Sequence, residues 1–202
     1  SIQWMAQMSH QREISELVQR LKKLLSYNLG KEGRQTTLRM ELEIVKEYIA
    51  LQQMRYDFII EMNIEDGSYL DQPTARMLFQ PLVENAIRYG LGDDEMISIQ
   101  VFEDVAWHLA VVTISDSGKG LNQEEIDEIN QPFDYDWGYW KNENRGIGLR
   151  YVKAMLESFY DGQTSLFVNS KKGFGTRITI LLPVRDPEQK KEKDKYKEVT
   201  LE

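Results

Sequence analysis

The sequence contains no cysteine and only two histidines, His10 and His108, among its 202 residues. The lack of cysteine excludes a disulfide framework, a thiolate metal site and a cysteine nucleophile, and the shortage of histidine nearly excludes a multi-histidine metal centre. Positive charge is also scarce, since 25 Lys and Arg stand against 33 Asp and Glu, for a formal net charge of -8. Broad nucleic-acid binding needs a basic face, so we expect no nucleic-acid partner.

Long hydrophobic runs are missing as well. No apolar stretch approaches the roughly 18 to 20 residues that a membrane-spanning helix needs, and there is no signal-peptide pattern. What is present is a globular composition, 41% hydrophobic and 29% charged, in a chain long enough for one or two domains with a core of their own. Because the chain opens at Ser1 inside a helical pattern without a methionine, we expect it to be a fragment of a longer protein.

Two amphipathic helices are predicted at the start of the chain. Residues 10–29 repeat apolar side chains at three- and four-residue steps and end before Gly30, and a second helix begins near Thr37, a candidate N-cap, and continues through Leu51. The short connector between them predicts an antiparallel pair. Such a pair is either a hairpin packed on its own domain or half of a dimeric four-helix bundle.

Downstream of residue 57, alternating strand patterns and helix patterns follow one another. The expected elements are a strand near 58–64, a helix that starts at Asp71 and Pro73 and reaches Gly90, strands at 97–101 and 109–114, helices at 123–130 and 148–159, and strands at 164–169 and 176–183. This order predicts an α+β sandwich with helices on one face of the sheet. We expect a helical segment at 1–55, an α+β domain at 56–185 and a polar, disordered tail at 186–202.

Two glycine-containing motifs lie beside predicted elements. Asp116 ends a strand and is followed by Gly118 and Gly120; its carboxylate can accept a hydrogen bond from an exocyclic amine, while the glycines let the backbone approach a flat ring. An ordinary Asp-Ser-Gly turn is the alternative. Gly146 and Gly148 open a helix, where exposed N–H groups and the helix dipole suit a phosphate, although a simple capping turn also explains them.

Polar residues also interrupt an apolar helix pattern and begin the last strand. Asn85 follows Glu84 among apolar neighbours, and its amide oxygen is a ligand that suits Mg²⁺. Arg88, one turn later, can reach a phosphate. A solvated helix face is the alternative for this group. Gly173 and Gly175 precede Thr176 in what otherwise is a hairpin turn.

The order of these motifs is more specific than any one of them. A Glu-Asn helix, Asp-x-Gly-x-Gly after a strand, a Gly-x-Gly-Leu helix and Gly-x-Gly-Thr before a strand resemble the successive boxes of the GHKL ATP-binding fold. The runs QPLVENAIRYG at 80–90 and LEIVKEYIALQ at 42–52, the latter followed by Met54-Arg55-Tyr56, are similar to sensor histidine kinases of the LytS/YehU type. The resemblance covers about residues 1–184.

The resemblance implies a Bergerat-type two-layer sandwich, with a mixed, mostly antiparallel sheet, preceded by the remnant of a helical hairpin. It implies ATP and Mg²⁺ as ligands, with Glu84 and Asn85 as the catalytic pair and Asn85 holding the metal. The other roles that it implies are adenine recognition by Asp116, an adenine pocket shaped by Gly118 and Gly120 and supported by Thr176, phosphate contacts from Arg88, Gly146, Gly148 and Leu149, and an ATP lid at 133–145.

Two departures from the pattern bear on activity. Related ATPases carry a glutamate one helical turn before the asparagine, where it activates water; here that position is Pro81, which favours a kinase over a hydrolase. The phosphoacceptor motif Asn-Pro-His-Phe is absent, and we interpret His10 as a surface residue and His108 as a hairpin residue. We therefore expect the fragment to bind ATP without phosphorylating itself.

The leading hypothesis is the catalytic ATP-binding part of a two-component protein-histidine kinase. It passes the γ-phosphoryl group of ATP to a histidine upstream, on its own or a partner subunit's helix, and then to an aspartate of a response regulator. We expect a homodimer in the intact protein and the cytoplasmic portion of a membrane-anchored sensor. The alternatives are another GHKL ATPase and a nucleotide-binding or interaction module without catalysis.

Overall fold

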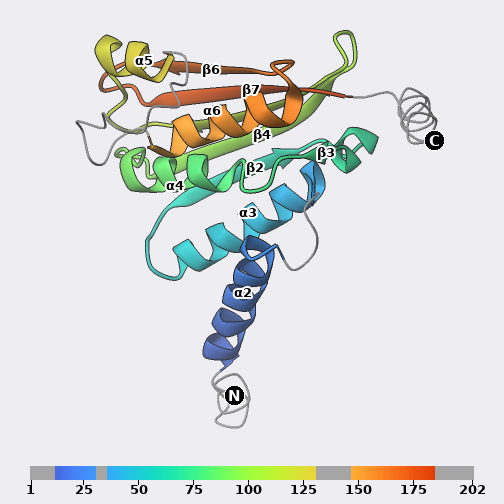
Figure 1. Cartoon of the computed structure of the whole chain (residues 1–202). Helices are drawn as coiled ribbons and strands as arrows, with labels where there is room; N and C mark the ends of the chain where they lie inside the picture. The colour runs from blue at the N-terminus through green and yellow to red at the C-terminus, as the bar shows by residue number, and fades with distance from the viewer. Residues whose placement is uncertain (1–11, 31–35, 131–146, 185–202) are drawn as a thin grey trace, which may run out of the picture.

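The computed structural model describes residues 12–30, 36–130 and 147–184. In this part of the chain one mixed sheet has the strand order β2-β4-β5-β7-β6, in which β2 runs parallel to β4 and the other neighbours are antiparallel. Its strands, shown in Figure 1, are β2 (Ile59–Ile64), β4 (Met96–Asp104), β5 (Leu109–Asp116), β6 (Ser165–Ser170) and β7 (Thr176–Pro183). The mostly antiparallel sheet of the predicted α+β class is confirmed.

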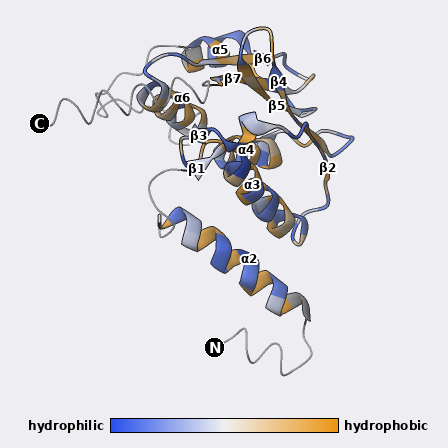
Figure 2. Cartoon of the chain, turned by 90° about the vertical axis from the view of Figure 1, so that its right-hand side faces the viewer, coloured by the Kyte–Doolittle hydropathy of each residue, from blue (hydrophilic) through white to orange (hydrophobic). Residues whose placement is uncertain are grey.

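Two helices at the start of the described chain form the predicted antiparallel pair. They are α2 (Arg12–Asn28) and α3 (Leu38–Gln53), and Thr37 caps α3 as expected, because its hydroxyl accepts a hydrogen bond from the Met40 backbone N–H at 3.2 Å. Leu24 packs on Ile44 in a small buried cluster. The rest of α2 extends away from the sheet, with hydrophobic positions interspersed along it (Figure 2), and the exposed ones are Ile14, Leu17, Leu21 and Leu25.

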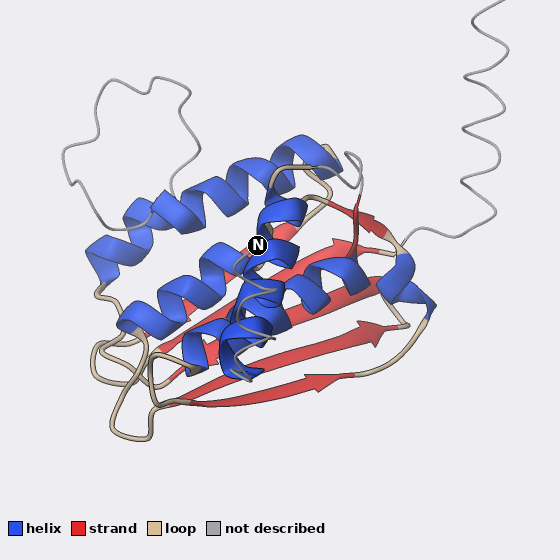
Figure 3. Cartoon of the chain, turned by 90° about the horizontal axis from the view of Figure 1, so that it is seen from below, coloured by secondary structure: helices blue, strands red, loops and turns tan. Residues whose placement is uncertain are grey.

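The main core lies between the sheet and three helices. Helices α3, α4 (Gln80–Tyr89) and α6 (Ile147–Tyr160) lie over one face of the sheet, as Figure 3 shows from below, while α5 (Gln123–Asn130) lies at one end beside β6 (Figure 1). Alternate side chains of the central strands are buried, as period-two patterning predicts. The fully covered core side chains are those of Leu78, Leu82, Val83, Ile97 and Val152.

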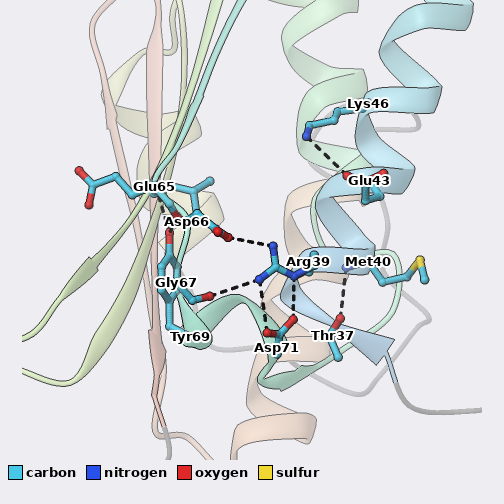
Figure 4. Close-up of polar contacts among 11 residues, drawn as sticks. Thr37, Arg39, Met40, Glu43, Lys46, Glu65, Asp66, Gly67, Tyr69 and Asp71 are labelled. Carbon is cyan, nitrogen blue, oxygen red and sulfur yellow. Dashed lines mark hydrogen bonds and ion pairs between the residues drawn. The ribbon is translucent and has the colours of Figure 1, made fainter.

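Helix α3 contributes to this main core, although the sequence suggests a separate helical segment that ends at residue 55. Leu42, Val45 and Ile49 belong to the same buried cluster as the sheet. Arg39 in the first turn of α3 also connects the helix to the segment after β2, because it forms ion pairs with Asp66 at 3.0 Å and with Asp71 at 2.7 Å (Figure 4). The boundary at 55/56 stays a prediction, but α3 packs as part of the sandwich.

The start of α4 differs from the prediction. We expected a helix from Asp71 and Pro73, whereas residues 68–71 form a short 3-10 helix and β3 (Pro73–Thr74) pairs with β1 (Thr36–Thr37). The helix begins only at Gln80, so Pro81, and not Pro73, is the proline of its first turn. Met77 lies just upstream with a φ of 55, a left-handed conformation that interrupts helical geometry.

A buried carboxylate explains why the chain turns there. Glu41 of α3 is 1% exposed, and its side chain accepts hydrogen bonds from the backbone N–H groups of Met77 and Leu78, each at 2.8 Å. The hydroxyl of Tyr27 donates to the same carboxylate. Met77 and Leu78 precede α4, which has no side-chain cap of its own, so Glu41 satisfies buried amides of the segment that leads into the helix.

None of the helices in the described ranges is both long and apolar enough to cross a membrane. The expectations for His10, for the predicted lid at 133–145 and for the tail at 186–202 concern residues outside the described ranges.

Replacing Glu41 by glutamine should destabilise the fold. The NH₂ group of the new amide can only donate, so at least one of the buried donors around it loses its acceptor, and we expect Glu41→Gln to lower the free energy of unfolding by about 1–3 kcal/mol. Urea denaturation at neutral pH measures the difference. The matched control is Glu43→Gln, whose half-exposed side chain pairs with Lys46 on the same helix, and whose effect should stay within about 0.5 kcal/mol. Equal effects of the two substitutions would contradict the capping role.

Candidate functional site

One cavity in the described part of the chain gathers five of the ten predicted site residues. It opens between α4, α6, the end of β5 and the start of β7, and its volume is about 130 Å³. The predicted residues that line it are Asn85, Asp116, Gly120, Leu149 and Thr176.

Asp116 is the last residue of β5, and the backbone around it fixes one of its two carboxylate oxygens. Oδ1 accepts hydrogen bonds from the N–H groups of Gly118 and Thr176, both at 3.1 Å. No other hydrogen bond from a described residue reaches this side chain, which leaves Oδ2 available to a ligand. Burial raises the pKa of the Asp116 carboxyl, while the two backbone hydrogen bonds oppose that rise.

Glycines bring the backbone close to this carboxylate. A Cβ at Gly90 would lie 2.4 Å from Cγ of Asp116, so only glycine fits at the end of α4. Gly120 has a φ of 63, and a Cβ there would lie 2.1 Å from the carbonyl oxygen of Lys171. Both positions therefore require glycine for close packing, and the turn alternative for the Asp-Ser-Gly string does not account for the contact with α4.

Asn85 enters the cavity from the second turn of α4. No hydrogen bond joins its amide to another described residue, so the group is available to a ligand. The start of α6 approaches it closely, since a Cβ at Gly148 would lie 3.2 Å from Nδ2 of Asn85 and 3.4 Å from Cβ of Pro81. Gly148 thus lets the N-terminus of α6 meet the amide side chain.

The other two polar residues of α4 lie outside the cavity lining. Glu84 and Arg88 form an ion pair at 2.8 Å on the helix surface. Burial, followed by the charge of Glu84, raises the pKa of Tyr48 on α3 to about 12. The structure therefore does not bring Glu84 to Asn85 as a pair facing the cavity, and a phosphate contact of Arg88 stays a prediction.

Two cationic residues that the sequence did not single out also line the cavity. Lys119 lies between the two glycines of the Asp-x-Gly-x-Gly string, with Nζ 5.1 Å from the centre of the Tyr89 ring. Arg150 follows Leu149 at the start of α6. Both stand next to motif residues, so their position beside the motifs was the available signal. The remaining wall is largely apolar, with Leu82, Ala86, Ile114, Leu121, Ile129 and Ile178.

One further expectation concerns a residue away from the cavity, and another concerns a residue that the structure does not describe. His108 lies in the turn between β4 and β5, as predicted, at the end of the sheet opposite Asp116. Gly146 lies outside the described residues.

The donor set fits a magnesium ion held mainly by a nucleotide. The described residues contain no group of three or more His, Cys, Asp or Glu side chains that could hold a metal by themselves. Mg²⁺ commonly takes one or two protein oxygens and completes its shell with water and phosphate. The amide of Asn85 in the cavity meets that requirement.

Two family models match the sequence. The model described as histidine kinase-, DNA gyrase B-, and HSP90-like ATPase matches residues 70–186, more than half of the chain, and the model described as histidine kinase matches residues 1–59. The first match contains the cavity, and the second contains α2 and α3.

The curated relatives of the chain are named as sensor protein kinases. The chain is 29% identical over 169 residues to the sensor protein kinase HptS of Staphylococcus aureus strain bovine RF122 / ET3-1, and equally to that of strain USA300. The alignment covers 83% of this chain and 32% of each relative. The chain thus spans about a third of the length of these relatives.

Solved structures share the fold. The Acinetobacter baumannii histidine kinase AdeS matches with a TM-score of 0.52 at 17% identity, over 91% of this chain and 84% of that one. The mycobacterial sensor histidine kinase MprB matches with a TM-score of 0.52 at 16% identity, over 74% and 95%. The first family model covers more than half of the chain, so the chain belongs to the histidine kinase-, DNA gyrase B- and HSP90-like ATPase family.

Proposed function

We propose that this chain binds Mg·ATP as the catalytic portion of a sensor protein-histidine kinase of the LytS/YehU type. The observation that carries the proposal is that Asp116 and Asn85 line one cavity with unused polar atoms. A lone carboxylate oxygen and a lone amide suit the two ends of a nucleotide, the exocyclic amine of the base and the metal on the phosphates.

The adenine end of the site rests on Asp116. Its Oδ2 accepts the exocyclic amine, while the apolar side chains of Ile114 and Ile178 cover the faces of the ring. Thr176 supports this end through its backbone N–H, which keeps Oδ1 in place. Gly118 does the same from the other side of the carboxylate.

The phosphate end rests on Asn85 and the start of α6. Mg²⁺, when bound, neutralises charge on the triphosphate. The side chain of Asn85 supplies an oxygen for the metal, and the N-terminus of α6 at Gly148 and Leu149 presents its dipole to the phosphates. Lys119 and Arg150 add positive charge to the wall of the same cavity.

A kinase is favoured over a hydrolase by Pro81. Pro81 lies one turn before Asn85 and packs against the start of α6. Its side chain has no group that could accept a proton from water. Glu84, the nearest carboxylate in sequence, lies outside the cavity lining and is paired with Arg88. The γ-phosphoryl group is therefore transferred not to water but to a histidine upstream of this segment, on the same or a partner subunit. From this histidine it passes to an aspartate of a response regulator. In this proposal the intact protein is a homodimer, and this segment is the cytoplasmic portion of a membrane-anchored sensor.

The role of Asp116 is tested by Asp116→Asn. The two backbone N–H groups hold an acceptor at the Oδ1 position, so the amide must turn its NH₂ toward the adenine amine, donor against donor. We expect ATP affinity to fall by about a hundredfold or more in calorimetry. The control is Asp104→Asn, whose carboxylate also accepts backbone N–H groups, from Ala106 and Trp107, at the far end of the sheet. Unchanged affinity in Asp116→Asn would refute the assignment.

The role of Asn85 is tested by comparing two forms of the nucleotide. Asn85→Ala should weaken binding of Mg·ATP by about tenfold, because the metal loses its protein oxygen, while metal-free ATP should weaken by less than about twofold. Calorimetry with and without Mg²⁺ gives both numbers, and Asn63→Ala on the exposed side of β2 serves as the control. If both nucleotide forms weaken equally, Asn85 does not hold the metal.

The choice between kinase and hydrolase is tested by phosphate release. With [γ-³²P]ATP and Mg²⁺, we expect this chain to release phosphate no faster than Asp116→Asn, since water has no general base near Pro81. Rapid release by the unaltered chain would favour the ATPase alternative.

A further inference from the structure

The carboxylate of Glu41 joins three helices that differ in their relation to the cavity. It belongs to α3, it receives the Tyr27 hydroxyl from α2, and it receives the backbone N–H groups of Met77 and Leu78 just before α4. Helix α4 carries Asn85 into the cavity, whereas α2 makes its contacts on the far side of α3. Within the described residues, this carboxylate is a direct polar connection between α2 and the segment that begins α4.

A second contact joins the same two segments. Arg76 places its guanidinium 4.4 Å from the centre of the Tyr27 ring and donates a hydrogen bond at 2.6 Å to the Tyr27 carbonyl oxygen. The Tyr27 hydroxyl also lies 2.8 Å from the Thr36 hydroxyl oxygen. The ring and the carbonyl oxygen of Tyr27 therefore contact Arg76, and its hydroxyl is connected to Met77 and Leu78 through Glu41. The last turn of α2 is thus held next to residues 76–78.

The core holds the start of α4 through the buried side chains of Leu78, Phe79 and Leu82, whereas the amides that lead into the helix depend on Glu41. Met77 adopts a left-handed conformation, and no side chain of the helix's own first turn caps it. Asn85 follows the capped residues by less than two and a half helical turns, so a tilt at the start of α4 moves its side chain relative to Asp116 on β5. A Cβ at Gly148 would lie 3.2 Å from Nδ2 of Asn85, so the start of α6 lies next to the side chain that such a tilt would move.

We propose that Glu41 is a positioning residue for α4, and that the Tyr27 hydroxyl couples the last turn of α2 to the nucleotide cavity through it. A displacement of α2 removes the Tyr27 hydroxyl, one of the donors to the buried Glu41 carboxylate. The hydrogen bonds from the Met77 and Leu78 amides to this carboxylate then change in geometry, and the shift of α4 that follows moves Asn85. The coupling to the cavity rests on the proposed function, whereas the positioning of α4 does not.

The test removes one hydroxyl group and follows α4 directly. Tyr27→Phe keeps the ring under Arg76, and Tyr69→Phe is the matched control, because Tyr69 is equally buried and its hydroxyl bonds backbone carbonyls near the other end of the sheet. In hydrogen exchange without nucleotide, we expect the amides of Met77, Leu78, Leu82 and Val83 to exchange about fivefold faster or more in Tyr27→Phe and not in Tyr69→Phe. In a Glu41→Gln background, Tyr27→Phe should add less than about twofold.

A second readout addresses the cavity. Tyr27→Phe should lower the ratio of Mg·ATP affinity to metal-free ATP affinity by about threefold, while Tyr69→Phe leaves the ratio unchanged. Unchanged exchange in α4, or an equal increase in Tyr69→Phe, would overturn the positioning role. Faster exchange with an unchanged affinity ratio would overturn the coupling to the cavity. Absence of ATP binding to the unaltered chain would refute the proposed function instead, and the exchange result would still decide the role of Glu41.

Discussion

The site depends on one carboxylate whose two oxygens have different tasks. The backbone N–H groups of Gly118 and Thr176 occupy Oδ1 of Asp116, so Oδ2 is the acceptor that faces a ligand. This arrangement needs β5 and β7 as antiparallel neighbours, with Asp116 opposite Thr176 in the register. It also needs glycine at position 90, because any side chain there would collide with the carboxylate. Sheet register and helix end thus combine to present one acceptor at the cavity wall.

The second requirement is that α4 be held at a fixed position over this wall. Its apolar side packs into the core through Leu82 and Val83, while Asn85 projects into the cavity. The core sets the distance of the helix from the sheet, and the buried carboxylate of Glu41 sets where the helix begins. A helix that started at Pro73 would lose the pairing of β3 with β1 and would leave Glu41 buried without its backbone partners.

Local sequence signals predicted the strands, most helix bounds and the cap at Thr37, because these depend on periodicity and short-range hydrogen bonds. The motif order also predicted five residues of the cavity wall, among them Asp116 and Asn85, whereas Glu84 and Arg88 lie outside it. The start of α4 was missed because Glu41 lies far away in sequence and looks like a surface residue of an amphipathic helix. Arg88 is a different case, because it follows Glu84 by four residues, a spacing that favours an ion pair on a helix, and the structure has that pair.

The most direct test concerns the proposed hydrogen bond from the exocyclic amine of the base to the free carboxylate oxygen of Asp116. Calorimetry of the unaltered chain with ATP and with inosine triphosphate, both with Mg²⁺, tests it directly, because the two nucleotides carry the same phosphates and sugar. Inosine triphosphate has a carbonyl oxygen where ATP has the amine, which sets acceptor against acceptor at Asp116. The account predicts that ATP binds about tenfold tighter or more. Equal affinity for the two nucleotides would contradict it.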